Sequence, residues 1–368
     1  MVVVDKNILL AIIGVLVVIV LVILLLKFFM FTVTMTAVSC LVFLIFKLWS
    51  MSSSSYENEK EDIFPFRNFV DEKGNKVPIV TLTAFFREGS KELYKKYLSR
   101  GIKVIGFTSY KTFPKPISDK SGDHDSMDDT FRYTSEIKNW AVCFKNLEEY
   151  GFTSFNNTIE LSESDFQDAS TEPKQVAKKY DFIYSCLSDD DEGVCPAGGW
   201  NAINRNFDLA KRCFPIMINE FGLKLLVVGR KNCGLEDLYG DKIEVVEFLP
   251  YDQFQEKMAQ SKYLFVPNIY DASPRVVTEA LSKGLPVLMN RQIVCGSKYI
   301  TNETGELFTD EHDIRYHLKK LLNRKMDTVA WWSKNYSRES AGKKFRDFLH
   351  SCYPDVPEVT RAREIYFG

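Results

Sequence analysis

The sequence lacks three patterns that would place it in a common functional class. Lysine and arginine (47 residues) do not outnumber aspartate and glutamate (49 residues), so no basic excess favours binding to nucleic acid. No G-x-G-x-x-G follows a strand-like segment, which disfavours an NAD-dependent Rossmann enzyme. The cysteines form no C-x-x-C pair and no metal-ligand spacing, so a structural metal site is not expected.

Charge is also missing near the start of the chain. Residues 8–26 and 28–46 contain no charged side chain, and a membrane-spanning helix needs about 20 apolar residues. We therefore expect residues 1–50 to form a membrane anchor with two spans; the alternative is one span with an interfacial remainder. The uncharged region is too long for a cleaved signal peptide. Residues 51–62 are polar and are expected to form a linker.

The cysteines beyond the apolar region are an odd, scattered set. They are Cys143, Cys186, Cys195, Cys213, Cys233, Cys295 and Cys352. Such a set is more typical of a reducing compartment than of a disulfide framework. The lysines that flank the two apolar runs are nearly symmetric, so they do not set the orientation. The cysteines therefore favour a membrane protein whose soluble part faces the cytosol.

Strand-like and helix-like segments alternate after the linker. Residues 77–86, 88–101 and 102–110 are predicted to form strand, helix and strand, an order typical of parallel strands joined by a right-handed crossover. Residues 132–152 are predicted to form one helix. The first half of the soluble part is therefore predicted to form a small α/β domain.

The second half repeats the same units more regularly. Its first helix is predicted over residues 201–222, with a kink at Pro215. Repeated β and α units of this length indicate a doubly wound parallel sheet. We expect an α/β protein with two Rossmann-like domains, at residues 63–177 and 178–345. A tail, residues 346–368, is expected to return toward the first domain.

One stretch, "DASPRVVTEALSKGLPVLMN" at residues 271–290, has the composition of a ligand site. It follows a predicted strand, and ligands of such sheets bind beyond the strand ends. Ser273 is the predicted N-cap, Pro274 the first helical residue and Gly284 the stop. The helix start would then present free amides to an anion such as phosphate. These amides belong to Arg275, Val276 and Val277.

Further motifs surround this stretch in a fixed order. They are "LLVVGR", "VEFLPYDQF", "DASPRVVTEALSKGLPVL" and "GELF". Over residues 223–309 the chain resembles the donor half of nucleotide-sugar glycosyltransferases of the GT-B fold, most like glycosyltransferase family 4. The resemblance implies a nucleotide-sugar donor, retention of the anomeric configuration, and no metal or other cofactor.

The resemblance also implies roles for single residues. Glu279 matches the glutamate that binds the ribose hydroxyls, although a surface pair with Lys283 is the simpler interpretation of this residue. Asp271 matches an acidic residue that contacts the donor sugar and is usually glutamate. Arg205 takes the place of a lysine that grips the diphosphate, and Arg275 is a second cation for it. Further donor-binding candidates are Ser273, Val276, Gly229, Arg230, Pro250 and Tyr251.

The first domain offers weaker candidates for the acceptor side. They are Gly89, His124, Glu163 and Asp165. An arginine that the family often has after the preceding strand is missing, and residues 189–192 are acidic there instead. This departure makes a non-catalytic nucleotide-sugar-binding subunit an alternative.

The expected partners are a nucleotide-sugar donor, a glycan or lipid-linked acceptor, and a membrane. A further alternative is a metal-dependent transferase of the GT-A type, which would depend on the D-x-D-like pair Asp123 and Asp125.

Overall fold

The computed structural model describes the chain in several ranges. They are residues 63–87, 89–108, 113–115, 130–168, 176–187, 195 and 199–368, with eight separate helical positions between residues 14 and 27. Residues 1–61 and 62–368 form two compact units. Among the described residues, no helix is long and apolar enough to cross a membrane. Most of the two predicted spans, and the predicted linker, lie outside the described residues.

The first sheet of the larger unit has the strand order β12-β1-β2-β3-β4-β5. Strands β2 to β5 are parallel, whereas β1 and β12 are antiparallel additions at one side. Helix α2 (Ser90–Ser99) connects β2 and β3, as the sequence predicts for this segment. The bounds are β1 Phe66–Asp71, β2 Lys76–Leu82, β3 Lys103–Phe107, β4 Asn139–Val142, β5 Asn157–Glu160 and β12 Ile365–Phe367.

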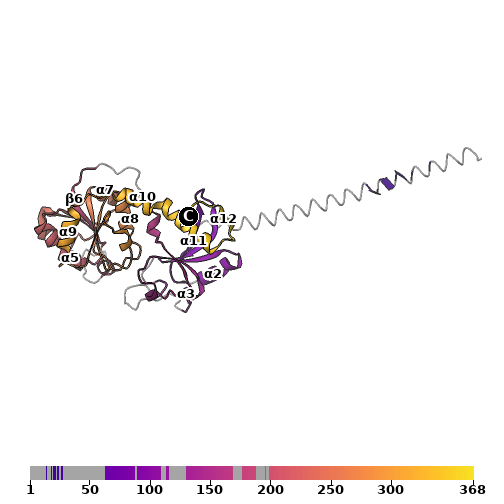
Figure 1. Ribbon diagram of the computed structural model, residues 1–368, viewed down its shortest axis with the longest axis horizontal. Coiled ribbons are helices and arrows are strands. Elements are labelled where there is room, and N and C mark those ends of the chain that lie inside the picture. The colour runs from indigo at the N-terminus through magenta and orange to yellow at the C-terminus, as the bar shows by residue number, and fades with distance from the viewer. Residues whose placement is uncertain are drawn as a thin grey trace, which may run out of the picture. The chain divides into compact units, whose positions relative to one another are not determined.

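The second sheet, with the order β11-β10-β9-β6-β7-β8, is parallel throughout. Its bounds are β6 Tyr180–Ser185, β7 Leu225–Val228, β8 Ile243–Val246, β9 Ser261–Val266, β10 Val287–Asn290 and β11 Gly305–Phe308. Helices cover both faces (Figure 1). One face packs against α5 (Phe207–Pro215) and α9 (Ile314–Leu322), the other against α7 (Tyr251–Ala259), α8 (Arg275–Ser282) and α10 (Thr328–Asn335). This confirms an α/β fold with two domains built on sheets of parallel strands.

The C-terminal segment belongs structurally to the first sheet. After α10 the chain continues as α11 (Ser337–Cys352) and α12 (Pro357–Arg361) and ends in β12. Apolar residues of α11 and β12 are buried with those of the first sheet, among them Phe345, Leu349 and Ile365. The first domain therefore depends on residues from both ends of this unit.

The prediction of a single helix over residues 132–152 is wrong. The segment forms the short helix α3 (Tyr133–Glu136), strand β4 and a 3-10 turn, η1 (Glu148–Tyr150). In β4, Trp140 is fully buried against β3, where a Cβ on Gly106 would lie 2.1 Å from the Trp140 ring. A buried strand of four residues is too short to show its own periodicity, so the sequence could not separate it from a helix.

Two helical segments are interrupted by backbone in the left-handed region, and one of them is the predicted helix over residues 201–222. The segment 201–222 consists of α4 (Trp200–Asn204), a break at Asn206 with φ 49°, and α5. A π-helix, η3 (Ile216–Glu220), follows Pro215 directly, so the proline marks a change in hydrogen bonding. Helices α10 and α11 are likewise separated next to Ser337, with φ 80°.

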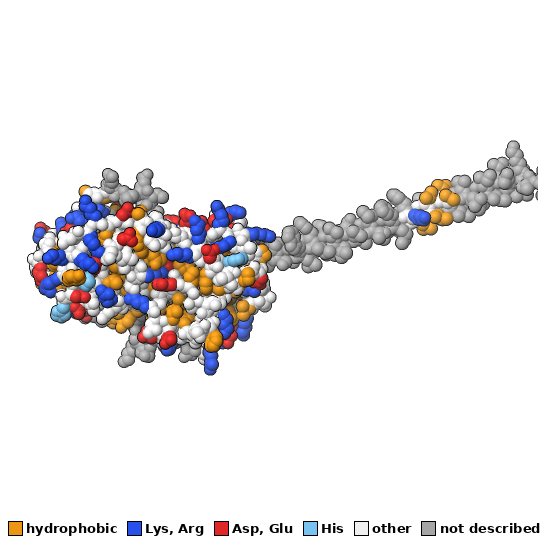
Figure 2. Space-filling view, viewed as in Figure 1, with side chains coloured by type: hydrophobic (Ala, Val, Ile, Leu, Met, Phe, Trp, Pro, Cys, Tyr) orange, Lys and Arg blue, Asp and Glu red, His pale blue; other side chains and the backbone are white. Residues whose placement is uncertain are grey.

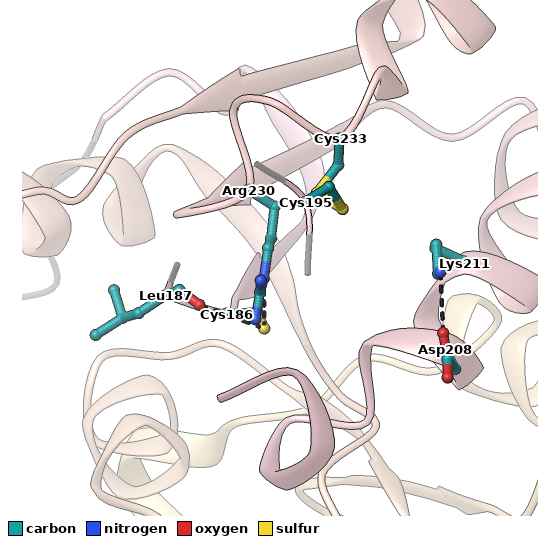
Figure 3. The surroundings of a disulfide bond; sticks show 7 residues. All are labelled: Cys186, Leu187, Cys195, Asp208, Lys211, Arg230 and Cys233. Carbon is teal, nitrogen blue, oxygen red and sulfur yellow. Dashed lines mark hydrogen bonds and ion pairs between the residues drawn. A yellow bond between two sulfur atoms is a disulfide. The ribbon is translucent and has the colours of Figure 1, made fainter. Parts of the chain in front are cut away.

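Two of the cysteines pair, although the set as a whole was more typical of a reducing compartment than of a disulfide framework. Cys195 and Cys233 form a disulfide between the loop after β6 and the loop after β7 (Figure 3). The two cysteines are 38 residues apart in sequence and meet because β6 and β7 are neighbours in the sheet. Sequence spacing alone does not reveal such a pairing. The cytosolic orientation, which was inferred from unpaired cysteines, stays a prediction.

Acidic and basic side chains are interspersed on the face of the molecule shown in Figure 2. On that face no single sign of charge dominates, which agrees with the balanced composition of the chain.

Candidate functional site

The predicted catalytic residues Arg205 and Asp271 meet beyond the carboxyl ends of β6 and β9. Arg205 caps α4, and Asp271 lies in the loop between β9 and α8. The Arg205 guanidinium and the Asp271 carboxylate form an ion pair in which Asp271 is largely buried. The Asn268 amide also donates to Asp271, at 3.1 Å. The structure thus brings together the cation predicted for the diphosphate and the carboxylate predicted for the sugar.

Backbone hydrogen bonds from two sides fix the loop that carries Asp271. The Ile269 amide donates to the Asn204 carbonyl at 3.1 Å, and the Val294 amide donates to the Ile269 carbonyl at 2.9 Å. The Cys295 amide donates to the Asp271 carbonyl at 3.2 Å. Among the described residues, the buried Asn204 Oδ1 has no hydrogen-bond partner, so this edge keeps an unused polar atom next to Arg205.

The start of α8 differs from the prediction. Pro274, rather than Ser273, is the N-cap, and no side chain caps the helix. The Arg275 amide donates to the Ser273 carbonyl at 2.8 Å, and the Val277 amide donates to the Pro274 carbonyl at 2.9 Å. Two of the three amides predicted to be free, those of Arg275 and Val277, therefore already donate hydrogen bonds to nearby backbone carbonyls. The side chain of Val276, which lies between them, is half-buried. At the other end, Gly284 follows the C-cap with φ 89°, which confirms the predicted stop.

Glu279 lies half-buried on α8 and faces α7. The Gln255 side-chain amide donates to Glu279 Oε2 at 2.9 Å, and Lys283 donates to the other end of the same amide. Gln255 thus contacts both Glu279 and Lys283, the two residues that the simpler interpretation pairs. Burial raises the pKa of Glu279, against the lowering effects of Gln255, Lys283 and Arg275. A carboxylate has about four acceptor positions, so the bond from Gln255 leaves capacity for ligand hydroxyls.

Exposed aromatic side chains lie at the start of α7, and one of them, Tyr251, interacts with Glu279. Pro250 is the N-cap of α7, Tyr251 is the first residue of this helix, and Phe248 precedes both. Tyr251 and Phe248 are largely exposed. The pKa of Tyr251 is raised first by burial and second by the Glu279 carboxylate, which shows that the two groups are close. The surface beside Glu279 can therefore stack a planar ring.

Gly229 and Arg230 support the site from beneath. Gly229 has φ 100°, and a Cβ there would lie 2.5 Å from the Cys186 carbonyl oxygen, so only glycine allows β7 to end this close to β6. Arg230 is 2% exposed, and its Nε donates to Cys186 Sγ at 3.1 Å beside the disulfide (Figure 3). Its guanidinium lies 5.1 Å from the Phe207 ring. Both residues shape the strand-end edge from inside the domain.

The acceptor-side candidates Glu163 and Asp165 contact the second domain. They lie in a 3-10 turn, η2 (Glu163–Phe166). Glu163 forms ion pairs with Arg275 at 3.2 Å and with Arg67 at 3.3 Å. Asp165 accepts hydrogen bonds from Lys298 at 2.6 Å and from Tyr299 at 2.5 Å. The sequence did not single out Lys298 or Tyr299, because neither has a motif and both act across the domain boundary.

The other two acceptor-side candidates are not part of this cluster: Gly89 lies elsewhere in the first domain, and His124 lies outside the described residues. Gly89 is the N-cap of α2 with φ 79°, in open space. His124, Asp123, Asp125 and residues 189–192 lie outside the described residues. Within the described part of the chain, no group of three or more His, Cys, Asp and Glu residues could hold a metal ion.

Residues 194–324 match the family model described as "Glycosyl transferases group 1". The matched segment, which is similar to group 1 glycosyl transferases, contains Arg205, Asp271, Glu279 and their neighbours. The assignment to glycosyltransferase family 4 is finer than the match and stays a prediction. No curated protein matches the chain.

Several solved structures are similar to the chain. A chain of the GtfA/B complex is 12% identical with a TM-score of 0.51, over 73% of this chain and 56% of that one. The pneumococcal O-GlcNAc transferase GtfA, solved with UDP and GlcNAc, is 12% identical with a TM-score of 0.48, over 75% of this chain and 56% of that one. A glycosyltransferase from Rickettsia africae is 13% identical with a TM-score of 0.49, over 77% of each chain. The first of these similarities confirms a GT-B-like arrangement of two α/β domains. This chain spans little more than half the length of the first two of these chains.

Proposed function

We propose that the protein transfers a sugar from a nucleotide-sugar donor to a glycan or lipid-linked acceptor. One observation carries this proposal: a half-buried glutamate and a paired arginine and aspartate lie near opposite ends of α8, within the segment that matches the group 1 family model. The pneumococcal GtfA structure contains UDP and GlcNAc, which supports a nucleotide sugar as the donor class.

The donor would bind along α8. Glu279, held by Gln255, would accept hydrogen bonds from ribose hydroxyls, and exposed Tyr251 offers a ring for the base. Arg205 would bind the diphosphate, since a guanidinium can make two parallel hydrogen bonds to phosphate oxygens. Asp271, beside Arg205, would accept from sugar hydroxyls. These assignments use Arg205, Asp271 and Glu279, three of the polar residues that the motif comparison singled out.

The reaction exchanges one bond of the anomeric carbon for another. The bond from that carbon to the diphosphate oxygen breaks, and a bond to the acceptor oxygen forms. The nucleoside diphosphate leaves with the bonding electron pair, and its leaving oxygen takes up the proton that the acceptor hydroxyl loses. Arg205 would stabilise the charge that develops on this leaving group without a metal ion. Retention of the anomeric configuration is part of the proposal because the motifs resemble those of family 4.

The apolar start of the chain makes a membrane-anchored transferase the proposed form, with its soluble part on the cytosolic side. The Cys195–Cys233 bond provides a test, since disulfides persist in oxidising surroundings. Thiol labelling of the full chain in intact and permeabilised cells should find both cysteines reduced if the soluble part is cytosolic. Cys195 and Cys233 that stay unlabelled after permeabilisation, and become labelled only after a reductant is added, would contradict that orientation.

A non-catalytic subunit is the second candidate, and it rests on the ion pairs themselves. Arg205 is neutralised by Asp271, and Arg275 is paired with Glu163 of the first domain. A protein that binds a nucleotide sugar without turnover could keep both pairs closed. Turnover, rather than binding, therefore separates the two functions.

The test is release of nucleoside diphosphate by the full chain from UDP-, GDP- and ADP-sugars. We expect release from at least one donor, surviving EDTA, and a drop of about a hundredfold in Arg205→Met, since loss of one transition-state contact has this size. Binding of a donor without release would favour the non-catalytic subunit. Release that EDTA abolishes would favour the metal-dependent alternative.

A further inference from the structure

A short segment of the first domain, Ser162–Asp165, contacts the loops of the second domain that surround Asp271. The hydroxyls of Ser162 and Ser164 each lie 2.7 Å from the Ser273 hydroxyl. Glu163 pairs with Arg275, the first residue of α8. Consecutive residues of one domain thus engage the start of α8 in the other.

Asp165 is the most deeply placed member of this segment. It is 0% exposed, and its carboxylate accepts three hydrogen bonds: from the Ser162 amide at 2.8 Å, from Lys298 and from Tyr299. The bond from Ser162 closes a capping box at the start of η2. An ionised carboxylate this deeply buried is tolerated when it is paired and hydrogen-bonded. Asp165 meets both conditions only while the two domains are together.

Lys298 is almost as deeply buried as its partner. Its side chain is 10% exposed, and its Nζ lies 5.1 Å from the Tyr299 ring and 5.3 Å from the Tyr336 ring. Burial is the largest single influence and lowers the pKa of Lys298, but the charge and hydrogen bond of Asp165, together with Cys295 and Tyr336, raise this pKa overall. Separating the domains would leave both charges without their main partner, so this contact strongly favours the docked arrangement.

The same contact reaches Asp271 through the backbone. Lys298 and Tyr299 form the turn η5 (Ser297–Tyr299), which directly follows Cys295 and Gly296. The Cys295 amide donates to the Asp271 carbonyl, and a Cβ on Gly296 would lie 2.5 Å from the Pro274 ring. The turn that Asp165 holds therefore packs directly against the loop that carries Asp271. No atom of Asp165 needs to touch a substrate to affect this loop.

We propose that Asp165 is a positioning residue: through Lys298 and Tyr299 it fixes the Asp271 loop in the arrangement needed for sugar transfer. This inference rests on the proposed function for its kinetic consequence, and it replaces the acceptor contact predicted from the sequence. The nucleotide end of the site, formed by Glu279 and Gln255, lies wholly in the second domain and does not depend on this contact. Substitution of Asp165 should therefore lower the turnover rate and leave the affinity for the nucleotide nearly unchanged.

The kinetic test compares Asp165→Asn with Glu148→Gln in the full chain. Glu148 is exposed in the same domain, so its variant matches the loss of charge without touching the interface. We expect kcat for diphosphate release to fall about tenfold to a hundredfold in Asp165→Asn, the usual effect of misplacing a reacting group. Its affinity for the free nucleoside diphosphate should change less than about twofold. Equal losses of turnover and affinity, or wild-type turnover, would overturn the proposal.

A second measurement does not need activity. Hydrogen exchange should become about tenfold faster at the Val294 and Cys295 amides in Asp165→Asn, because these amides donate to the loop that carries Asp271. The Gly229 amide, which donates to the Val246 carbonyl at 2.8 Å, is the internal reference and should not change. Unchanged exchange at Val294 and Cys295 refutes the positioning role even if the protein transfers no sugar. Faster exchange without any donor turnover supports it and places the failure with the proposed function.

Tyr299→Phe is the milder variant in case Asp165→Asn does not fold. It removes one donor to Asp165 and keeps the ring that packs against Trp332 at 5.8 Å. It should show the same separation of kcat from nucleotide affinity at a smaller amplitude, and the same local exchange pattern. Wild-type values for both measurements in a folded Tyr299→Phe protein contradict the proposal.

Discussion

The two ends of helix α8 are organised in different ways. Toward its C-terminal end, Glu279 is held by Gln255 of α7, a neighbour within the same domain. At its N-terminal end, Ser273 and Arg275 are held by Ser162, Ser164 and Glu163 of the other domain. One end is complete within a single Rossmann-like domain, and the other requires both domains. In our account the first binds the nucleotide and the second positions the transferred sugar.

Among the substitutions at the two ends of α8, we expect the largest loss of stability from one at Lys298. In Lys298→Met, Asp165 stays buried without its cationic partner, so we expect unfolding free energy to fall by about 3–5 kcal/mol. Gln255→Met, at the other end of α8, removes a hydrogen bond to a half-buried carboxylate and should cost only about 1–2 kcal/mol. Urea unfolding of both variants in the full chain checks the order. A larger loss in Gln255→Met would contradict the difference between the two ends.

The hydroxyl cluster offers a smaller perturbation of the same interface. Ser164→Ala removes one of the two hydroxyls that meet Ser273, and we expect a loss of about 1 kcal/mol, since neutral hydrogen bonds contribute this much. Ser99→Ala is a matched control, because the Ser99 hydroxyl bonds only within its own exposed helix end. Thermal unfolding at constant pH measures both. If the melting temperature falls as much for Ser99→Ala as for Ser164→Ala, the interface hydrogen bond stabilises the protein no more than one at an exposed helix end.

The mildest change is in pH dependence at the nucleotide end. Burial raises the pKa of Glu279, so its proton is held more tightly in the folded protein than in the unfolded chain. This carboxylate therefore costs stability at neutral pH, and the cost disappears as pH falls through the raised pKa. Nucleotide affinity should weaken over the same range, because the protonated acid is a poorer hydroxyl acceptor.

Gln255→Ala sharpens that prediction. The hydrogen bond from Gln255 lowers the pKa of Glu279, so its removal should move the affinity loss to higher pH. Titration of nucleoside diphosphate binding between about pH 4 and 8 follows the shift. A profile that moves to lower pH, or does not move, would show that Glu279 is not the group that titrates.

The same contrast explains what the sequence could predict. The nucleotide end was visible because its signals are local: Glu279, Gly284 and the following strand lie within one short segment. The interdomain end was not, since Asp165 and Lys298 are 133 residues apart and neither lies in a motif. Backbone breaks at Asn206 and Ser337 were also missed, because neither is the glycine that usually marks left-handed backbone.

Short buried elements also limited what could be predicted from the sequence. Strand β4 was taken for part of a helix, because its four residues are all buried between β3 and β5 and show no alternation. Pairing of Cys195 with Cys233 depends on the strand order, which sequence spacing does not contain. Alternating units alone were enough to predict two α/β domains, since that signal is repeated along the whole soluble part.

The central claim is that Glu279 binds the nucleotide of a sugar donor. Isothermal titration of the full chain with UDP, GDP and ADP tests it directly, with Glu279→Gln beside the wild type and Glu303→Gln as the exposed control. We predict that at least one nucleotide binds the wild type and the control alike, and that Glu279→Gln weakens its binding by about tenfold or more, the size expected for lost charge-assisted hydrogen bonds. Equal affinity of Glu279→Gln and wild type for the bound nucleotide would contradict the account.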